Sequence, residues 1–347
     1  MVEVSVIIPT HRRPAFLEDA IASVLQQTYT QFELIVVYGG AQPKTAEALE
    51  AIHDDRLHTI ARNQPLGSSA ARNAGLEAAT GQYVVFLDDD DYLLEHAIET
   101  LLQTFHEQPD DCAGVIACEI EKYPSGKTNE THVPEGVVDR YEDAPITRGS
   151  CVFFQNVAVK EVGGFDASFP ARADTDFLIR MLSRFRLFYL NERLYVRRHH
   201  EDQVTRDPEV NIEGNLRLLE KHAENLSLRR QLHYLNMVAN WYRQIGTENT
   251  EDLQRKIGQI TTYLNSSDNA LSATESAECY HLLAHVAAKL GQPSTARARW
   301  RRAIQYCPYN KTYWFHYWWT HFGTIGYGLG MTISSRIYRP IAARLGH

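Results

Sequence analysis

The sequence predicts an α/β fold with a mostly parallel sheet, followed by an all-helical region. Two patterns carry this prediction. Apolar runs of strand length alternate with helix-like periodicity up to residue 91. Beyond residue 210 glycine and proline thin out and helical periodicity dominates. A chain of 347 residues has room for about two domains, and we expect them to span residues 1–205 and 206–347.

The predicted elements of the first domain follow one another as strand, helix and strand. Residues 4–9 form a β-branched run, which is typical of a strand buried on both faces of a parallel sheet. Further strands are predicted at 32–37, 57–60 and 83–87, and helices at 14–27, 44–52 and 69–79. A sheet of this kind binds its ligands at the carboxyl ends of its strands.

After residue 91 the pattern changes. We expect a helix over 93–105, a strand over 114–123 and a turn-rich loop over 124–145. In the C-terminal region, residues 281–309 predict two helices joined by a Gly291-Gln292-Pro293 turn, which resembles one tetratricopeptide-type hairpin. No clean repeat of that length follows, so an extended solenoid is not expected.

Composition excludes several classes of protein. With 44% hydrophobic and 22% charged residues, the chain is of ordinary globular composition, unlike disordered, collagen-like or coiled-coil proteins. The N-terminus has no signal-peptide pattern and no apolar run is long enough to span a membrane, so we expect a cytoplasmic protein. The 5 cysteines are scattered without Cys-x-x-Cys spacing, which predicts neither a disulfide framework nor a zinc cluster.

Charge and aromatic residues are distributed unevenly. The net charge is −8, yet no Asp or Glu occurs from residue 279 to the end, where four of the 5 tryptophans also lie, at 300, 314, 318 and 319. Basic and aromatic residues together favour an anionic membrane surface as partner. The alternatives are that the rings pack against the helical region or that its helices form a homo-oligomer. A nucleic-acid partner is not expected, because the first domain is acidic and no binding motif is present. The basic residues of this stretch are Lys289, Arg297, Arg299, Arg301, Arg302, Lys311, Arg336, Arg339 and Arg344.

Four consecutive aspartates, Asp88 to Asp91, follow the apolar run at 83–87. Adjacent carboxylates repel one another at the end of a buried strand unless a cation neutralises them. Mg²⁺ and Mn²⁺ bind carboxylate oxygens together with phosphate oxygens, so the pattern predicts a divalent ion held between protein and a nucleotide diphosphate. The alternative is an acidic turn that caps a helix beginning near Tyr92.

Together with the Ile7-Ile8-Pro9-Thr10 segment, these residues resemble the inverting family 2 glycosyltransferases, which have the GT-A fold and use nucleotide-activated sugars. The resemblance covers about residues 3–205. It implies that Pro9, Thr10 and Arg12 begin the nucleotide pocket, and that Arg72 and Asn73 also bind the donor. Arg72 could instead form an ordinary helix ion pair, and Asn73 could be solvated.

The same resemblance gives the aspartates separate roles. Asp88 and Asp90 match the metal-binding Asp-x-Asp motif, with Mn²⁺ or Mg²⁺ as cofactor, and Asp88 also contacts the donor. Asp89, between them, faces the sugar or ribose.

Two further segments resemble motifs of this family. Gly163-Gly164-Phe165-Asp166 precedes Asp174, which matches the catalytic base. Displacement at an anomeric carbon needs such a carboxylate to take the proton of the acceptor hydroxyl. Asp176 could instead be a cap or an ion-pair partner of Arg180.

The segment 197–203 resembles the closing Arg-x-His of the family, whose histidine approaches the metal or the diphosphate. On register we expect that histidine to be His199 rather than His200. The alternative is that both histidines belong to a polar loop.

The chain departs from the family pattern at Val37-Tyr38-Gly39-Gly40, where Asp-Asp-Gly-Ser is usual. Tyr38 could stack on the base, or the donor could be other than a UDP-sugar. Ala173 also replaces the usual Glu before the base. A degenerate domain acting as a binding or scaffold protein therefore stays open as the alternative.

The resemblance as a whole implies metal-dependent, inverting sugar transfer. The donor would be a nucleotide sugar and the acceptor a glycan or a lipid-linked molecule, in bacterial surface polysaccharide or glycoconjugate synthesis. Such an enzyme would work in the cytoplasm or on the inner face of the cell membrane.

Overall fold

The computed structural model describes residues 2–11, 13–40, 42–64, 66–145, 152–201, 203, 206–246, 250–266 and 271–320. The chain divides into two compact units, Met1–Arg206 and Asp207–His347. The first is built on a mixed sheet and the second contains helices alone among its described residues. The predicted fold class is confirmed.

The sheet of the first unit joins two sets of parallel strands. In its order, β3-β2-β1-β4-β9-β6-β10-β5, strands β1 to β4 are parallel, and so are β6 and β10. Strand β9 lies antiparallel between β4 and β6, so the two sets point the same way. Their carboxyl ends therefore share one edge of the sheet. The strands named here are β1 Val4–Thr10, β2 Phe32–Gly39, β3 Leu57–Arg62, β4 Tyr83–Phe86, β5 Tyr92–Leu93, β6 Cys112–Lys122, β9 Val152–Gln155 and β10 Arg186–Arg198.

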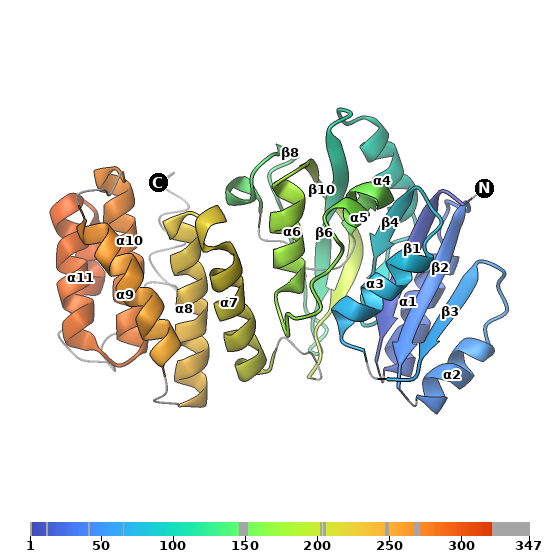
Figure 1. Cartoon of the computed structure of the whole chain (residues 1–347), viewed down its shortest axis with the longest axis horizontal. Helices are drawn as coiled ribbons and strands as arrows, with labels where there is room; N and C mark the ends of the chain where they lie inside the picture. Colours follow the sequence, from blue (N-terminus) through green and yellow to red (C-terminus); the bar gives the residue numbers. More distant parts are fainter. Residues whose placement is uncertain are drawn as a thin grey trace. The chain divides into compact units, whose positions relative to one another are not determined.

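Helices cover both faces of the sheet, and the strands alternate their side chains between two cores. In β1, Val6 and Ile8 join the core with helices α1 and α4, whereas Ile7 joins the core with α3, α5 and α6. Figure 1 shows strands β1, β2 and β3 side by side, and α3 packs against β1 and β2. The helices are α1 Pro14–Leu25, α2 Pro43–Glu50, α3 Ser68–Ala78, α4 Ala97–His106, α5 Asn156–Glu161 and α6 Ala173–Leu182.

The structure differs from the predicted elements after residue 91. Tyr92 and Leu93 form a strand with β10, so α4 begins only at Ala97. The predicted loop 124–145 contains β7 Thr128–Glu130, β8 Gly136–Val138 and the short 3₁₀ helix η1 Tyr141–Asp143. These short strands pair with β6 and β10, which is a tertiary contact that no local pattern specifies.

Helix α6 is anchored by a buried ion pair. Asp176 is fully buried, and its carboxylate accepts hydrogen bonds from Arg180 at 2.7 and 2.9 Å. Arg180 also donates to the carbonyls of Val162 and Gly164. The alternative considered for Asp176, an ion pair at the i,i+4 helix spacing, is therefore what the structure contains.

The second unit consists of α7 Pro208–His222, the 3₁₀ helix η3 Ala223–Asn225, α8 Leu228–Ile245, α9 Glu251–Asn265, α10 Ala273–Lys289, α11 Pro293–Tyr306 and α12 Lys311–Trp319. Helices α10 and α11 form the predicted hairpin. Its turn contains Gly291 with a positive φ of 71°, and Pro293 begins α11. Trp300 of α11 is fully buried against alanines of α10.

Gly75 is required where α3 packs on the sheet. A Cβ atom there would lie 2.4 Å from Cγ2 of Ile7 in β1. We therefore expect Gly75→Ala to lower the free energy of unfolding by about 1–3 kcal/mol through overpacking. Urea denaturation measures this. Gly67→Ala, at the N-cap of the same helix and with open space around its Cβ, is the matched control, and an equal loss there would contradict the packing argument.

Asp176→Asn should destabilise the first unit by about 3 kcal/mol, because it leaves the Arg180 charge without its buried partner. Asp252→Asn removes an exposed ion pair with Arg255 and should cost less than about 1 kcal/mol. Thermal or urea unfolding compares the two. Equal stabilities of the two variants would show that the buried pair is not a structural anchor.

Candidate functional site

The four aspartates lie where β4 ends, at the shared carboxyl edge of the sheet. Asp89, Asp90 and Asp91 are buried, with 6%, 9% and 2% exposed, and Asp88 is half-buried. So much negative charge in a small buried volume is tolerated only when each carboxylate has a partner. The partners come from three segments, which are residues 10–13, helix α3 and residues 198–200.

Asp88 and Asp89 face the N-terminal half of the sheet. Arg72 of α3 donates to Asp88 and also lies over the Phe165 ring at 5.2 Å. Asp89 accepts hydrogen bonds from the Thr10 hydroxyl at 2.7 Å, from the His11 amide at 3.2 Å and from Arg13 at 3.2 Å. Burial raises the pKa of Asp89 to about 6, although the Arg13 charge and the Thr10 hydrogen bond oppose that shift.

Asp90 and Asp91 face strand β10. Asp90 binds Arg13 and lies 2.8 Å from Nε2 of His200. Asp91 accepts from the backbone amide of Arg198 at 3.1 Å. The Arg198 guanidinium in turn donates to the Asp90 carbonyl at 2.5 Å. The end of β10 is thereby tied to the aspartate segment.

Of the two histidines after β10, the structure places His200, not His199, beside Asp90. His199 lies 3.2 Å from Glu121 of β6 and stacks on Tyr123 at 4.2 Å. The reason is strand alternation, since Arg197 and His199 both point to the side on which Glu121 of β6 lies, whereas Arg198 and His200 point to the side of Asp90. The expected register, which favoured His199 for the metal, differs from this arrangement.

The side chain of Asn73 forms hydrogen bonds with backbone atoms of Phe165, so its amide is not available to a sugar donor. Its amide nitrogen donates to the Phe165 carbonyl at 2.7 Å, and its amide oxygen accepts from the Phe165 amide at 2.8 Å. The adjoining Gly164 has a positive φ of 64°, and a Cβ there would lie 2.6 Å from the Asn73 oxygen. Asn73 therefore holds the turn that leads toward α6, and the structure gives its side chain this role.

Asp174 lies in the first turn of α6 and is half-buried. Its carboxylate accepts from the amide of Thr175 at 2.8 Å, which leaves its other oxygen able to accept a proton. Arg172, which precedes the helix, has a positive φ of 69° and is the one non-glycine residue with such a value among the described residues. A backbone strained next to Asp174 is typical of a functional position.

The remaining predicted donor residues lie at the same edge of the sheet. Pro9 and Thr10 end β1, and Thr10 is paired in register with Tyr38 of β2. The glycine after Tyr38 is required locally, because a Cβ on Gly39 would lie 2.4 Å from the Gln64 carbonyl. Arg12 lies outside the described residues.

The aspartate segment fits a divalent cation. Asp88, Asp90 and Asp91 each offer a carboxylate oxygen, and these atoms lie within 4.8 Å of one another. An all-oxygen donor set suits Mg²⁺ or Mn²⁺. Asp91 thus joins the expected pair, and its contribution was not foreseen.

Sequence reasoning also missed Arg13 and Arg198. Arg13 donates to the carboxylates of Asp89 and Asp90, whereas Arg198 donates from its backbone amide to Asp91 and from its guanidinium to the Asp90 backbone carbonyl. The chain separates both arginines from the aspartate segment by more than 70 residues. A weak signal existed, since both belong to Arg-Arg pairs, and the first of these pairs closely follows the strand predicted at 4–9.

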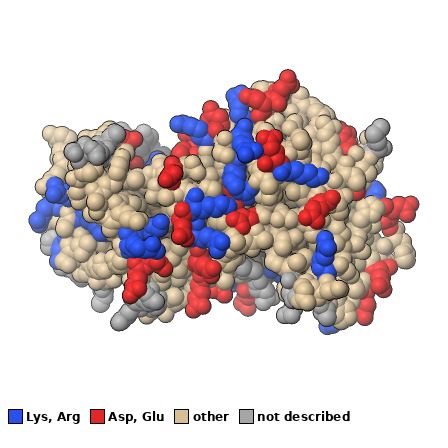
Figure 2. All heavy atoms as spheres, in the orientation of Figure 1, with Lys and Arg blue, Asp and Glu red and all other residues tan. Residues whose placement is uncertain are grey.

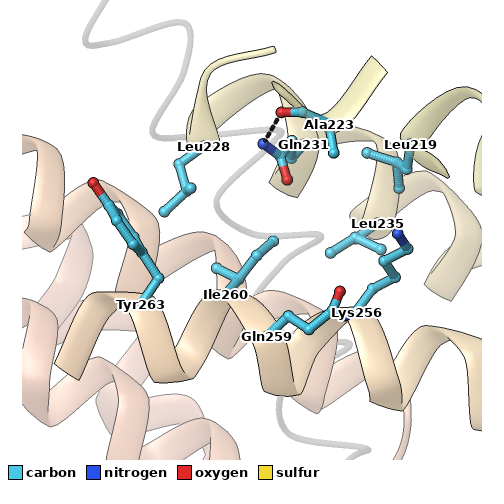
Figure 3. A pocket seen from close by; sticks show the side chains of 9 residues that line it. All are labelled: Leu219, Ala223, Leu228, Gln231, Leu235, Lys256, Gln259, Ile260 and Tyr263. Carbon is cyan, nitrogen blue, oxygen red and sulfur yellow. Dashed lines mark hydrogen bonds between the residues drawn. The ribbon is translucent and has the colours of Figure 1, made fainter. Parts of the chain in front are cut away.

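The helical unit contains a pocket of about 180 Å³ between α7, α8 and α9 (Figure 3). Leucine and isoleucine side chains form much of its lining, and Gln231 is fixed by a hydrogen bond to the Ala223 carbonyl. Its polar groups are two glutamines, Lys256 and Tyr263, which do not form an acid–base pair or a metal-ligand set. The aspartate segment is therefore the better candidate for a catalytic site than this pocket.

The predicted group of tryptophans divides in the structure. Trp300 is buried, whereas Trp314 and Trp318 of α12 are 48% and 65% exposed. Figure 2 shows basic side chains over the end of the helical unit that α10 and α11 form, whereas the first unit displays both signs of charge. Residues 321–347, with Arg336, Arg339 and Arg344, lie outside the described part of the chain, as does the Trp319 side chain. Within the described part, no helix has the length and apolarity that crossing a bilayer demands.

Comparisons with known proteins agree with this geometry. Residues 5–163 match the family described as Glycosyl transferase family 2. The chain is 37% identical over 110 residues to the GalNAc(5)-diNAcBac-PP-undecaprenol beta-1,3-glucosyltransferase of Campylobacter jejuni, covering 31% of this chain and 36% of that one. It is 35% identical over 107 residues to the putative teichuronic acid biosynthesis glycosyltransferase TuaG of Bacillus subtilis, covering 30% and 42%. The matches thus span well under half the length of these curated relatives.

The fold has solved counterparts. The crystal structure of S. aureus TarS 1-349 superposes with a TM-score of 0.55 at 16% identity, covering 88% of this chain and 89% of that one. The same protein in complex with UDP-GlcNAc gives 0.53 at 17% identity, with the same coverage. The family match over residues 5–163, the curated relatives and this GT-A architecture agree, and the chain contains a Glycosyl transferase family 2 domain that is followed by an all-helical region.

Proposed function

We propose that this protein transfers a sugar, with inversion, from a nucleotide-diphosphate donor to a hydroxyl group of a glycan or lipid-linked acceptor. The single observation that carries the proposal is the convergence of the aspartate segment with Arg72, Arg13 and His200 at the carboxyl edge of the sheet. Carboxylates for a cation and guanidinium groups for phosphate in one place suit a diphosphate. The relatives named above, of which one is a glucosyltransferase, support the same reaction class.

The donor would lie along the ends of β1, β2 and α3. Pro9, Thr10 and Tyr38 would meet the nucleoside, and Arg72 the diphosphate, while Asp89 would face the ribose or the sugar. A divalent cation held by Asp88, Asp90 and Asp91 would stabilise the negative charge that develops on the leaving diphosphate. His200, from its place beside Asp90, is the histidine suited to approach that charge.

Asp174 would act on the acceptor. The acceptor oxygen forms a bond to the anomeric carbon, while the bond from that carbon to the diphosphate oxygen breaks and its electron pair leaves with the nucleoside diphosphate. The proton of the acceptor hydroxyl goes to the Asp174 carboxylate. Asp176 cannot share this task, because it is fully buried and paired with Arg180.

The reaction is tested by screening nucleotide sugars with the purified protein. A donor that binds only the native state raises the unfolding temperature by mass action, and release of nucleoside diphosphate then reports turnover. The alternative of a catalytically inactive scaffold rests on the departures from the family pattern at Tyr38, Gly39 and Ala173, and the comparisons do not favour it. Surface polysaccharide or glycoconjugate synthesis as the setting, and a homo-oligomer through the helices, stay predictions.

Asp90→Ala should abolish metal-dependent nucleotide binding, because it removes a central cation ligand and leaves Arg13 and His200 without their common partner. Isothermal calorimetry with the donor, in the presence and absence of Mn²⁺, measures this. Asp139→Ala, at an exposed aspartate of the same unit, is the control. Unchanged Mn²⁺-dependent affinity in the Asp90 variant would place the cation elsewhere.

Asp174→Asn should lower turnover by about 10²-fold or more, the usual effect of losing a general base, while donor affinity and stability are retained. Asp176→Asn differs, since its loss of activity should follow its loss of stability. Initial rates at saturating donor, measured with an unfolding curve for each variant, separate the two. A near wild-type rate for Asp174→Asn would remove it from the mechanism.

Trp314 and Trp318, with basic residues such as Lys311 and Arg301 of the same region, should hold the protein to anionic bilayers, each basic residue near the surface contributing about 1 kcal/mol. A Trp314→Ser/Trp318→Ser variant should therefore sediment less with anionic vesicles. The substitutions are preferable to deleting α12, because Tyr313 and His316 of that helix are buried. Binding that ignores salt or occurs equally on zwitterionic vesicles would contradict an electrostatic surface contact.

A further inference from the structure

Three histidines converge inside the helical unit, far along the chain from the aspartates. His281 and His285 lie one turn apart on α10, and His316 comes from α12. One ring nitrogen of each lies within 4.8 Å of the others. The Nε2 atoms of His281 and His285 are 3.0 Å apart.

His316 is the member that packing alone does not explain. It is only 5% exposed, and within the described part of the chain neither of its ring nitrogens has a hydrogen-bond partner. Its ring centroid lies 4.8 Å from that of His285 and 5.3 Å from that of His281. A buried imidazole normally satisfies both nitrogens, so an orphaned one aimed at two other imidazoles indicates a missing partner.

We propose that His281, His285 and His316 bind one divalent transition-metal ion of the zinc class. Imidazole nitrogens favour Zn²⁺, Co²⁺, Ni²⁺ and Cu²⁺ over Mg²⁺ and Mn²⁺, so this site differs in chemistry from the oxygen set of the aspartates. Nitrogens at about 2.0–2.1 Å from a tetrahedral zinc lie about 3.3 Å apart, which the present spacing approaches. Three protein ligands leave a fourth position for water, and the partly exposed His281 gives solvent a route to it.

A histidine must be uncharged to bind a metal ion. Burial lowers the pKa of His281 to about 3 and that of His316 to about 4. At these two histidines, protons therefore compete weakly with a metal ion at pH 7.

The hydrogen bond from Trp300 to His281 determines which nitrogen of His281 carries a proton, and this affects metal binding. The indole Nε1–H of Trp300 donates to Nδ1 of His281 at 2.9 Å, and an indole nitrogen can only donate. In the metal-free protein the His281 proton is therefore on Nε2, facing His285. Binding a metal through Nε2 moves that proton to Nδ1 and breaks the hydrogen bond to Trp300. The indole thus opposes the ligand tautomer, and its fluorescence should report occupancy.

Metal binding would link two helices of the helical unit. A metal ion on these ligands joins α12 to α10, and α12 is the helix that carries the exposed Trp314 and Trp318. The ion would stabilise this end of the helical unit independently of sugar transfer.

The test uses the full-length protein, stripped of metal and titrated with Co²⁺. We expect one equivalent to give the intense visible absorption of a tetrahedral nitrogen-ligated site, with a change in tryptophan emission and a higher unfolding temperature. Zn²⁺ should displace the Co²⁺, and excess Mg²⁺ should not. The Asp90→Ala variant should respond in the same way, which separates this site from the aspartates.

Variants provide the sharper test. Because His316 has no hydrogen bond to lose, His316→Leu should leave the metal-free unfolding temperature unchanged or higher, yet weaken Co²⁺ binding at least tenfold. His233→Leu, in the same unit but outside the cluster, is the matched control and should bind as the parent does. Trp300→Phe removes the opposing donor and should bind at least as tightly. The proposal is overturned if no tetrahedral absorption develops, or if His316→Leu and the parent respond equally to Co²⁺.

Discussion

Compensation of four adjacent carboxylates is the constraint on which the first unit depends. Asp88 is paired by α3, Asp89 by the end of β1, Asp90 by Arg13 and His200, and Asp91 by the backbone of β10. The partners belong to three segments, residues 10–13, helix α3 and residues 198–200, which the aspartates join at one edge of the sheet. The excess acidity that remains after pairing is what makes the edge receptive to a cation and, through it, to phosphate.

The sequence indicated those parts of the structure that local periodicity specifies. Strands β1 and β4 could be predicted because both faces are buried, and α1 and α3 because apolar residues recur at helical spacing. The aspartate segment and Asp174 were found by motif. The short strands β7 and β8 were missed because each is stable only by pairing with a long strand distant in sequence.

The histidine register shows why site details are harder to predict. Strand β10 has irregularities between Arg186 and Phe188, and on either side of Arg193. Each irregularity changes which face a later residue occupies, so counting along the sequence cannot decide between His199 and His200. Asn73 illustrates a different difficulty, since a motif identifies a residue without saying whether it touches ligand or backbone. In the helical unit, likewise, composition grouped the tryptophans, and only helix packing separated Trp300 from Trp314.

The antiparallel strand β9 between two parallel sets has a consequence for the order of folding. Strands β1 to β4 are connected by successive short helices, so their contacts are comparatively local and can form early. The contacts from β10 to the aspartates join residues 107 and 108 positions apart, so we expect them to form later than the contacts among β1 to β4. The contacts that join the aspartate segment to β10 are therefore expected among the last to form during folding. They should also be among the first features lost when β10 opens locally while the rest of the sheet stays intact.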